Sequence, residues 1–336
     1  MSNFSQPVAY RDLFILTLYF AEGSILLASN GLLFAIIVYH EALRERKQFI
    51  LIGGLAFADA LQAGLGNIAA AIYRIPLVLE HQHQQPENRL TCLLTLHNLV
   101  WLYSRACAPF MLLAVSVDRY LAVKIPFTYL KLTKTYALLI TGAVYIYCLF
   151  EMAAKSWRVY QANATLDVTR MCFSSEASLP FDYRLHFGRE TAMAMLSIVV
   201  YLFVIRRVGK MTVDRNKTIQ AQLAWEKRLT RSVGLSCHCT FIFYAVPTGL
   251  INVLSYFPEL YVKLVGFTWT IICLNPLCNL LIYVKKQEDI RKGLMAMVAC
   301  KKMPPDLEAW HANQQAEKNR RKQHRKQQVA PAEAQL

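Results

Sequence analysis

Charged residues are scarce in this chain of 336 residues: Asp, Glu, Lys and Arg make up 18% of it, whereas soluble domains carry about a quarter. Hydrophobic residues make up 55%, and they are gathered into long blocks separated by polar, often basic, stretches. A helix needs about 20 apolar residues to cross a bilayer core about 30 Å thick. The composition therefore excludes an ordinary soluble domain and favours a helical membrane protein.

Seven blocks are long enough to cross a membrane, at residues 13–40, 48–73, 92–117, 134–154, 185–208, 229–256 and 260–284. No basic region precedes the first block, which is also too long for the apolar core of a cleavable signal peptide. We therefore expect it to remain as an anchor. The sequence predicts an all-α membrane protein, a seven-transmembrane helix bundle over 13–284 after a short extracellular N-terminus at 1–12.

The net charge of +15 at first suggests a nucleic-acid partner, but its distribution argues against one. If the N-terminus is outside the cell, 27 of the 37 Lys and Arg residues fall in the cytoplasmic loops and tail, which is the positive-inside bias. The basic run at 318–326 could in isolation be a nuclear signal or an RNA-binding arm; behind seven spans, attraction to anionic membrane lipid is the better interpretation. We expect a multi-pass plasma-membrane protein with a disordered basic cytoplasmic tail at 301–336.

Cysteine positions follow the same topology. Of nine cysteines, only Cys92 and Cys172 fall on the outer, oxidising side, so a disulfide between them is predicted. Asn3 and Asn163 begin glycosylation sequons that also lie outside. The Cys237-His238-Cys239 run lacks a second ligand pair, and neither a metal site nor a cofactor is expected.

A short amphipathic helix is expected after the seventh block, over 285–300. Its apolar residues are spaced by three and four, at Ile290, Leu294, Met297 and Val298, which suits a helix lying on the inner membrane surface. Cys300 at its end is a candidate for lipidation.

The stretch from Ser116 to Val123 reads Ser-Val-Asp-Arg-Tyr-Leu-Ala-Val and is followed by Pro126. It resembles the inner end of the third helix in rhodopsin-like G-protein-coupled receptors. The resemblance implies that Arg119 meets a heterotrimeric G protein when the sixth helix moves outward, that Asp118 restrains it at rest, and that Tyr120 and Pro126 belong to the same coupling motif. A snorkelling arginine at a helix end is the alternative, but it explains none of the neighbours.

The resemblance extends over about 13–297. It implies a polar network in the bundle core formed by Asn30, Asp59, Asn275 and Pro276, because a carboxylate at mid-membrane must find polar partners. Asn30 and Asn275 are the partners that the family would supply to Asp59. Within the family, the outer Cys92 and the mid-helix Pro109 most resemble nematode serpentine chemoreceptors of class SX.

Several positions depart from the family's pattern. Ala245 replaces the aromatic switch of the sixth helix, and Asn279 replaces the tyrosine after Pro276. Ala108 stands where a serine usually completes a sodium site, and basic Lys227 replaces the acid that locks the arginine.

The expected ligand site opens outward between the third, fifth, sixth and seventh helices. Trp101 stands where receptors for amines carry the carboxylate that binds the amine, so an amine ligand is disfavoured. The stretch 266–272 lacks the lysine that holds retinal in opsins, so an opsin is disfavoured too. Arg105 must face the bundle and find an anion. One alternative is an internal pair with Glu190 or Glu151; the other is an anionic ligand held bidentately by Arg105 with Arg189 nearby.

Aromatic walls for this pocket are expected from Trp101, Phe241, Tyr244 and Trp269. The function that follows is a receptor for an extracellular small molecule or peptide, with a chemosensory role. A multi-pass transporter or ligand-gated channel is the alternative, although the halves of the chain do not resemble each other as the inverted repeats of many transporters do. A membrane enzyme is disfavoured because no cluster of His or carboxylates stands at a membrane face.

Overall fold

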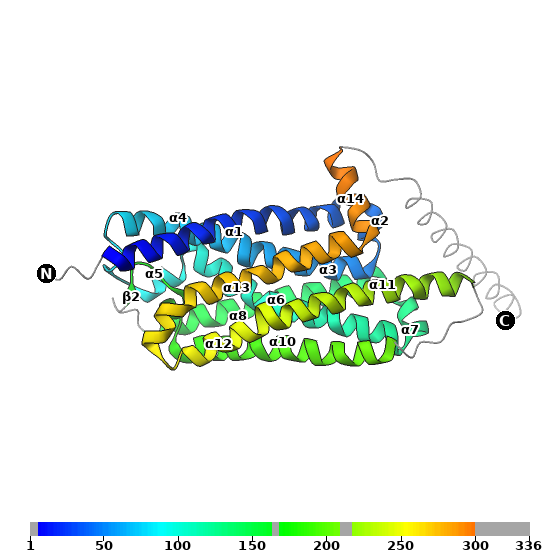
Figure 1. Cartoon of the computed structure of the whole chain (residues 1–336). Helices are drawn as coiled ribbons and strands as arrows, with labels where there is room; N and C mark the ends of the chain where they lie inside the picture. The colour runs from blue at the N-terminus through cyan, green and yellow to red at the C-terminus, as the bar shows by residue number, and fades with distance from the viewer. Residues whose placement is uncertain (1–5, 163–167, 209–216, 300–336) are drawn as a thin grey trace, which may run out of the picture.

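The computed structural model describes residues 6–162, 168–208 and 217–299, and these form a bundle of long helices lying side by side (Figure 1). Seven of the described helices are long and apolar enough to cross a membrane. The all-α membrane bundle predicted from the sequence is therefore confirmed. The only sheet in these ranges pairs two short antiparallel strands, β1 (Pro86–Glu87) and β2 (Val168–Thr169).

The spans follow chain order. They are α1 (Gln6–Tyr39); α3 (Lys47–Asp59), η1 (Ala60–Leu65) and α4 (Gly66–Leu79) as one continuous span; α6 (Leu96–Lys124); α8 (Lys134–Gln161); α10 (Pro180–Val208); α11 (Lys217–Thr240), η2 (Phe241–Ala245) and α12 (Val246–Leu254) as another; and α13 (Pro258–Lys286). Shorter helices are α2 (Glu41–Arg44), α5 (Arg89–Leu93), α7 (Pro126–Lys131), α9 (Ser174–Ala177) and α14 (Glu288–Val298).

Most spans differ in extent from their hydrophobic blocks. The second span continues past Arg74 to Leu79, the fourth past Lys155 to Gln161, and the fifth already begins at Pro180. Hydropathy ended these blocks at charged residues, but the charged side chains have partners inside the protein and do not interrupt the helix. The third span begins later than expected, at Leu96, because Cys92 lies on the separate helix α5.

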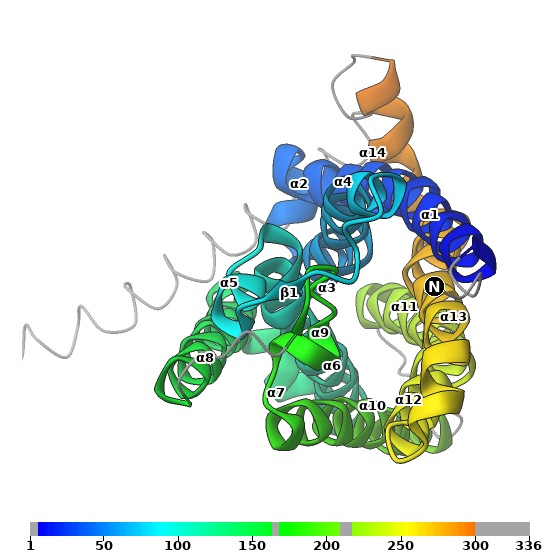
Figure 2. The same cartoon turned by 90° about the vertical axis from the view of Figure 1, so that its left-hand side faces the viewer.

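The fourth span is the least enclosed of the seven. In its most apolar stretch 11% of the residues are buried, against 83% for the second span, and Figure 2 shows α8 at the outer edge of the bundle. Its few buried residues are Ala137, Cys148, Lys155 and Val159. A buried lysine on an otherwise peripheral helix indicates that polar contacts, as well as apolar packing, attach α8 to its neighbours.

The two ends of the bundle differ. At the end we call the disulfide end, Cys92 of α5 is bonded to Cys172, which precedes α9 (Cα–Cα 4.9 Å), so the predicted disulfide is present. Opposite it lies the Arg119 end, where α14 turns away from the bundle (Figures 1 and 2). Fully buried Ile290 belongs to the core cluster there, and His40 Nε2 bonds the Gly293 carbonyl at 3.1 Å.

Four sites and one tail predicted from the sequence lie outside the described residues. They are the sequons at Asn3 and Asn163, the lipidation candidate Cys300, the side chain of Lys227, and the tail at 301–336.

The close approach of η1 to α1 gives a test of the packing. A Cβ atom at Gly64 would lie 2.8 Å from Leu27 Cα, and backbone at that distance cannot give way cheaply. We expect Gly64→Ala to lower the free energy of unfolding by about 1–3 kcal/mol, seen as a lower melting temperature of the purified protein in detergent. Gly142→Ala on α8 is the matched control, because a Cβ there meets nothing within 4 Å; equal melting temperatures for both variants would contradict this packing.

Candidate functional site

At the Arg119 end, a proline turns the chain back under helix α6. The helix ends at Lys124, and Pro126 then occupies the first turn of α7. A residue before proline is pushed out of the helical conformation, and Ile125 has φ −131° and ψ 61°. This turn brings Tyr129 beneath Asp118 and Arg119.

Asp118, Arg119 and Tyr129 form a closed, buried triangle. Arg119 Nε donates to Asp118 Oδ2 at 3.1 Å, and Arg119 Nη2 donates to the Tyr129 hydroxyl at 2.6 Å. The Tyr129 hydroxyl in turn donates to Asp118 Oδ2 at 3.1 Å. The Arg119 residue is 1% exposed. In this conformation the guanidinium is held inside the protein and cannot reach a partner outside it.

Lys47, which the sequence analysis did not single out, secures this triangle from helix α3. Its ammonium donates to the backbone carbonyls of Tyr129 and Leu132, the latter at 3.0 Å, and lies 3.6 Å from the centre of the Tyr129 ring. In the sequence, the signal that could have pointed to Lys47 is its place as a basic residue at the start of the second span. Tyr120 is half-buried, with Lys124 Nζ 5.2 Å from its ring.

The core polar residues gather around a cavity in the middle of the bundle. Asp59 is 4% exposed and lines the cavity together with Asn275, Pro276 and Asn279. Asn275 accepts a hydrogen bond from Thr240 at 3.0 Å, and Asn279 accepts one from Ser236. Asn279, at the position of the family's tyrosine, thereby links α13 to α11.

The expected pairing of Asn30 with Asp59 is wrong. Asn30 is 1% exposed, but its Nδ2 donates to the Leu26 carbonyl one turn earlier on its own helix, at 3.4 Å. An amide side chain on an apolar helix can bond a carbonyl of the preceding turn. The need of the Asp59 carboxylate for polar partners therefore does not determine what Asn30 contacts.

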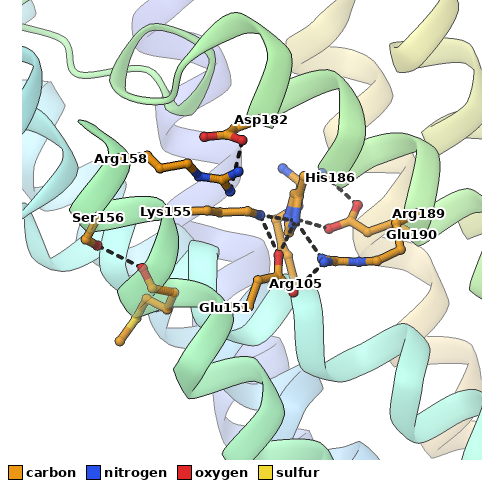
Figure 3. A network of polar contacts seen from close by, with 10 residues as sticks. Arg105, Glu151, Lys155, Ser156, Arg158, Asp182, His186, Arg189 and Glu190 are labelled. Atoms are coloured by element: carbon orange, nitrogen blue, oxygen red, sulfur yellow. Dashed lines mark hydrogen bonds and ion pairs between the residues drawn. The ribbon is translucent and has the colours of Figure 1, made fainter. Parts of the chain in front are cut away.

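Near the disulfide end, an ion-pair network joins helices α6, α8 and α10 (Figure 3). Arg105 Nη2 lies 3.0 Å from Glu190 Oε2, and both residues are buried. Of the two alternatives for Arg105, the internal pair with Glu190 is therefore the one in the structure. Arg189 lies 2.5 Å from Glu151 of α8, so it too has an internal partner.

His186 lies at the centre of this network, with Lys155 pointing toward it from α8 (Figure 3). Its Nδ1 atom lies 2.7 Å from Lys155 Nζ and 3.0 Å from Arg189 Nη2. Because an ammonium and a guanidinium have only donors, Nδ1 is the acceptor in both contacts. On the other side of the ring, Nε2 lies 2.8 Å from Glu190 Oε1. The sequence analysis identified neither His186 nor Lys155.

A cavity lies beside the network, roofed by α5, α9 and the residues around them. Its lining is Leu93, Asn98, Trp101, Leu102, Arg105, Lys155, Ser174, Ala177, Ser178, Asp182, Tyr183 and His186. The Trp101 and Trp269 rings meet edge to face at 5.7 Å, and the Arg105 guanidinium carbon lies 4.7 Å from the Trp269 ring. These three predicted pocket residues are therefore brought together.

Two of the expected aromatic walls lie elsewhere. Tyr244 is buried but lines the mid-bundle cavity instead. Phe241 is 42% exposed, so the expectation that it lines the pocket is wrong. Both stand on η2, where the helix widens to a π-type turn, and such a turn shifts the facing of the residues on it.

Arg74 is a buried arginine that the sequence analysis missed. Its Nε donates to the Met171 carbonyl and its Nη2 to the Cys172 carbonyl, both at 2.8 Å. Its guanidinium carbon also lies 4.7 Å from the centre of the Phe173 ring. Arg74 therefore anchors the disulfide-bonded segment that covers the cavity.

No three His, Cys, Asp or Glu residues within the described ranges are grouped as metal ligands. His238, in the cysteine-flanked run, bonds the Gly234 carbonyl of its own helix through Nδ1 at 2.8 Å. Helix α6 therefore has charged and aromatic groups suited to reversible binding near the disulfide end, and a buried arginine, Arg119, at the opposite end.

Residues 29–288 match the family model of the seven-transmembrane receptors of the rhodopsin family. The chain belongs to that family and is a multi-pass membrane protein. Among its relatives are the proteins named G-protein coupled receptor 12 of mouse, rat and human. They are 24%, 26% and 25% identical to this chain, over 85% of its length and 81% of theirs.

The Arg105–Glu190 pair gives a stability test. Glu190→Gln would leave the Arg105 charge buried without its partner, which we expect to cost about 3–5 kcal/mol of unfolding free energy. The double variant Arg105→Met with Glu190→Met should recover most of that loss. Thermal melting in detergent measures both.

The exposed pair between Lys292 and Glu288 is the control, since its side chains are 28% and 55% exposed. Glu288→Gln should change stability by no more than about 1 kcal/mol. A Glu190→Gln protein as stable as that control would contradict the buried pair.

Proposed function

We propose that this receptor binds an extracellular ligand at the disulfide end and activates a heterotrimeric G protein at the Arg119 end, in the plasma membrane. The N-terminus is then outside the cell and the C-terminus in the cytoplasm. The observation that carries this proposal is the buried triangle of Asp118, Arg119 and Tyr129. It holds the family's coupling arginine in a closed state at the end of α6 opposite the cavity.

Activation requires two states that the ligand and the G protein bind differently. In the closed state the arginine is fully engaged with the protein itself. A G protein can gain a contact with Arg119 only after Tyr129 and Asp118 release it. The π-type turns η1 and η2 lie near mid-bundle, and such turns mark places where a helix can change its hydrogen-bond register. Outward movement of the sixth span about η2 is the transition we propose.

The ligand we propose is a small molecule or peptide that carries negative charge. Arg105, Arg189 and Lys155 supply the cations, and because each already contacts a carboxylate, a ligand anion must compete with it or use a donor that remains free. Cys92, Pro109 and the motif at 116–123 resemble those of nematode serpentine chemoreceptors, which supports a chemosensory role.

The triangle can be tested without knowing the ligand. Tyr129→Phe removes the hydroxyl that bonds both Asp118 and Arg119, so we expect ligand-independent nucleotide exchange to rise several-fold in reconstituted membranes with purified G protein. Adding Arg119→Ala to this variant should return exchange to background. Tyr147→Phe on the exposed face of α8 is the matched control, with no expected effect.

Surface expression must be equal for all four proteins. If the double variant kept the raised exchange of Tyr129→Phe, the coupling role of Arg119 would be wrong. If Tyr129→Phe matched the control, the triangle would not be the resting restraint.

The proposed orientation is tested separately with epitope tags. A tag placed before Met1 should bind antibody on intact cells, and a tag after Leu336 only after permeabilisation, because most basic residues flank the spans on the C-terminal side of the membrane. The reverse pattern would overturn both the orientation and the assignment of the cavity to the outside.

A further inference from the structure

Helix α11 carries three buried hydroxyl groups that are spaced one turn apart. They belong to Ser232, Ser236 and Thr240, each of which is at most 2% exposed. Residues four apart lie above one another on one face of a helix, so the three hydroxyls form a single row. Buried polar groups are usually paired, and this row therefore calls for a row of partners on a neighbouring helix.

Helix α13 and the residue that follows it supply those partners as amide side chains, each at most 6% exposed. In order toward the Arg119 end, the bonded pairs are Thr240 with Asn275, Ser236 with Asn279, and Ser232 with Gln287. The first of them measures 3.0 Å from Thr240 Oγ1 to Asn275 Oδ1. We call the three hydrogen bonds the polar ladder and each bond a rung. The ladder joins the inner part of the sixth span to the seventh.

The rung nearest the Arg119 end uses an amide that is firmly anchored. Gln287 lies between α13 and α14, where its N–H donates to the Tyr283 carbonyl at 2.8 Å and its carbonyl accepts from the Arg291 N–H at 3.0 Å. Helix α14 is itself fixed to the bundle through Ile290 and Gly293. Gln287 is therefore held with the seventh span, and movement of the sixth span away from the seventh must break its bond.

The sixth span needs a restraint of this kind. The buried triangle at the Arg119 end lies on α6 and α7, so none of its three residues belongs to the sixth span. Basic Lys227 stands where the family has the acid that ties the sixth span to the arginine. Ser232 lies nine residues before η2, about 14 Å along the helix. In a movement about η2, the rung at Ser232 therefore opens furthest and the rung at Thr240 least.

We propose that the polar ladder holds the sixth span closed, and that Ser232, Ser236 and Gln287 are positioning residues for G-protein activation. All rungs are made in the closed state, and the two nearest the Arg119 end are broken in the open state. The ladder thereby sets the fraction of receptors that are open without ligand. This inference rests on the proposed function only in that opening leads to nucleotide exchange.

Spin labels on the purified receptor test the ladder without a G protein. They are attached to azidophenylalanine introduced at the exposed positions of Arg231 on α11 and Lys285 on α13, which leaves the native cysteines in place. Double electron–electron resonance then gives the fraction of molecules in which the two helices have separated. We expect Ser236→Ala and Gln287→Met each to raise that open fraction about threefold, the factor that one hydrogen bond between membrane helices supplies. The double variant should raise it about tenfold.

Two further variants separate the ladder from general stability. Thr240→Val removes the rung beside η2, which opens least, and should raise the open fraction less than Gln287→Met does. Tyr145→Phe is the matched control, because the Tyr145 hydroxyl donates to the Gly54 carbonyl at 2.7 Å and so joins α8 to α3 instead. Its loss should lower the melting temperature and leave the separation of α11 and α13 unchanged.

An open fraction in the double variant equal to that of the wild type would overturn the proposal, and so would an equal rise in Tyr145→Phe and Gln287→Met. If the double variant fails to fold, the comparison of those two single variants decides. Wider separation with nucleotide exchange still at background supports the ladder and counts against the proposed function. Unchanged separation overturns the ladder and leaves the proposed function to its own test.

Discussion

The cost of a charge inside the membrane is the constraint on which this structure depends. A single Lys, Arg or Asp at the centre of a transmembrane helix costs about 2.5–3.5 kcal/mol on insertion scales. Helices α6, α8 and α10 carry several charged residues toward the disulfide end, and their side chains meet one another. Helix α8 buries little else, so the network attaches a peripheral helix to the bundle. Its charges are structural even where they also offer binding groups.

Helix α6 carries a buried arginine toward each end of the bundle, and the distance between the two is the distance over which a signal would have to pass. Fourteen residues separate Arg105 from Arg119, about 21 Å along α6 at the usual rise. Helix α10 runs beside it and is bonded to it at two levels, through Glu190 to Arg105 and through Ser197 to Ser116 at 2.7 Å. One turn further on, the Tyr201 hydroxyl donates to the Thr230 carbonyl of α11. Helix α10 is therefore bonded to α6 at two levels and to the sixth span at a third.

Hydropathy was sufficient for the seven spans, because each span depends on short-range pattern. The Cys92–Cys172 bond joins residues 80 positions apart, and it could be predicted because the topology places only these two cysteines on the outer side. The misplaced span ends share another cause. A hydropathy window penalises Arg74 or Lys155 whatever surrounds it, whereas in the fold Arg74 bonds the Met171 carbonyl and Lys155 contacts the His186 ring, besides Glu151 on its own helix. For the same reason Glu190 could be named as one partner of Arg105 but not selected, and His186, in the part of α10 near the disulfide end, gave no signal. The wrong pairing of Asn30 shows that chemical suitability alone does not determine contact.

Buried arginines at the disulfide end are satisfied in two different ways, and the difference separates their roles. The hydrogen-bond partners of Arg74 are neutral: two backbone carbonyls and the ring of His97. No anionic ligand can replace those carbonyls without breaking the chain segment they belong to, so Arg74 fixes the covering loop. Arg105 is instead satisfied by the side-chain carboxylate of Glu190, a group of the same chemistry as a ligand carboxylate and one that shares its second oxygen with His186. In the function that we propose, exchange of Glu190 for a ligand carboxylate leaves the charge balance of Arg105 unchanged and releases Glu190 and His186 on α10. We therefore propose Arg105, and not Arg74, as the arginine that responds to an anionic ligand.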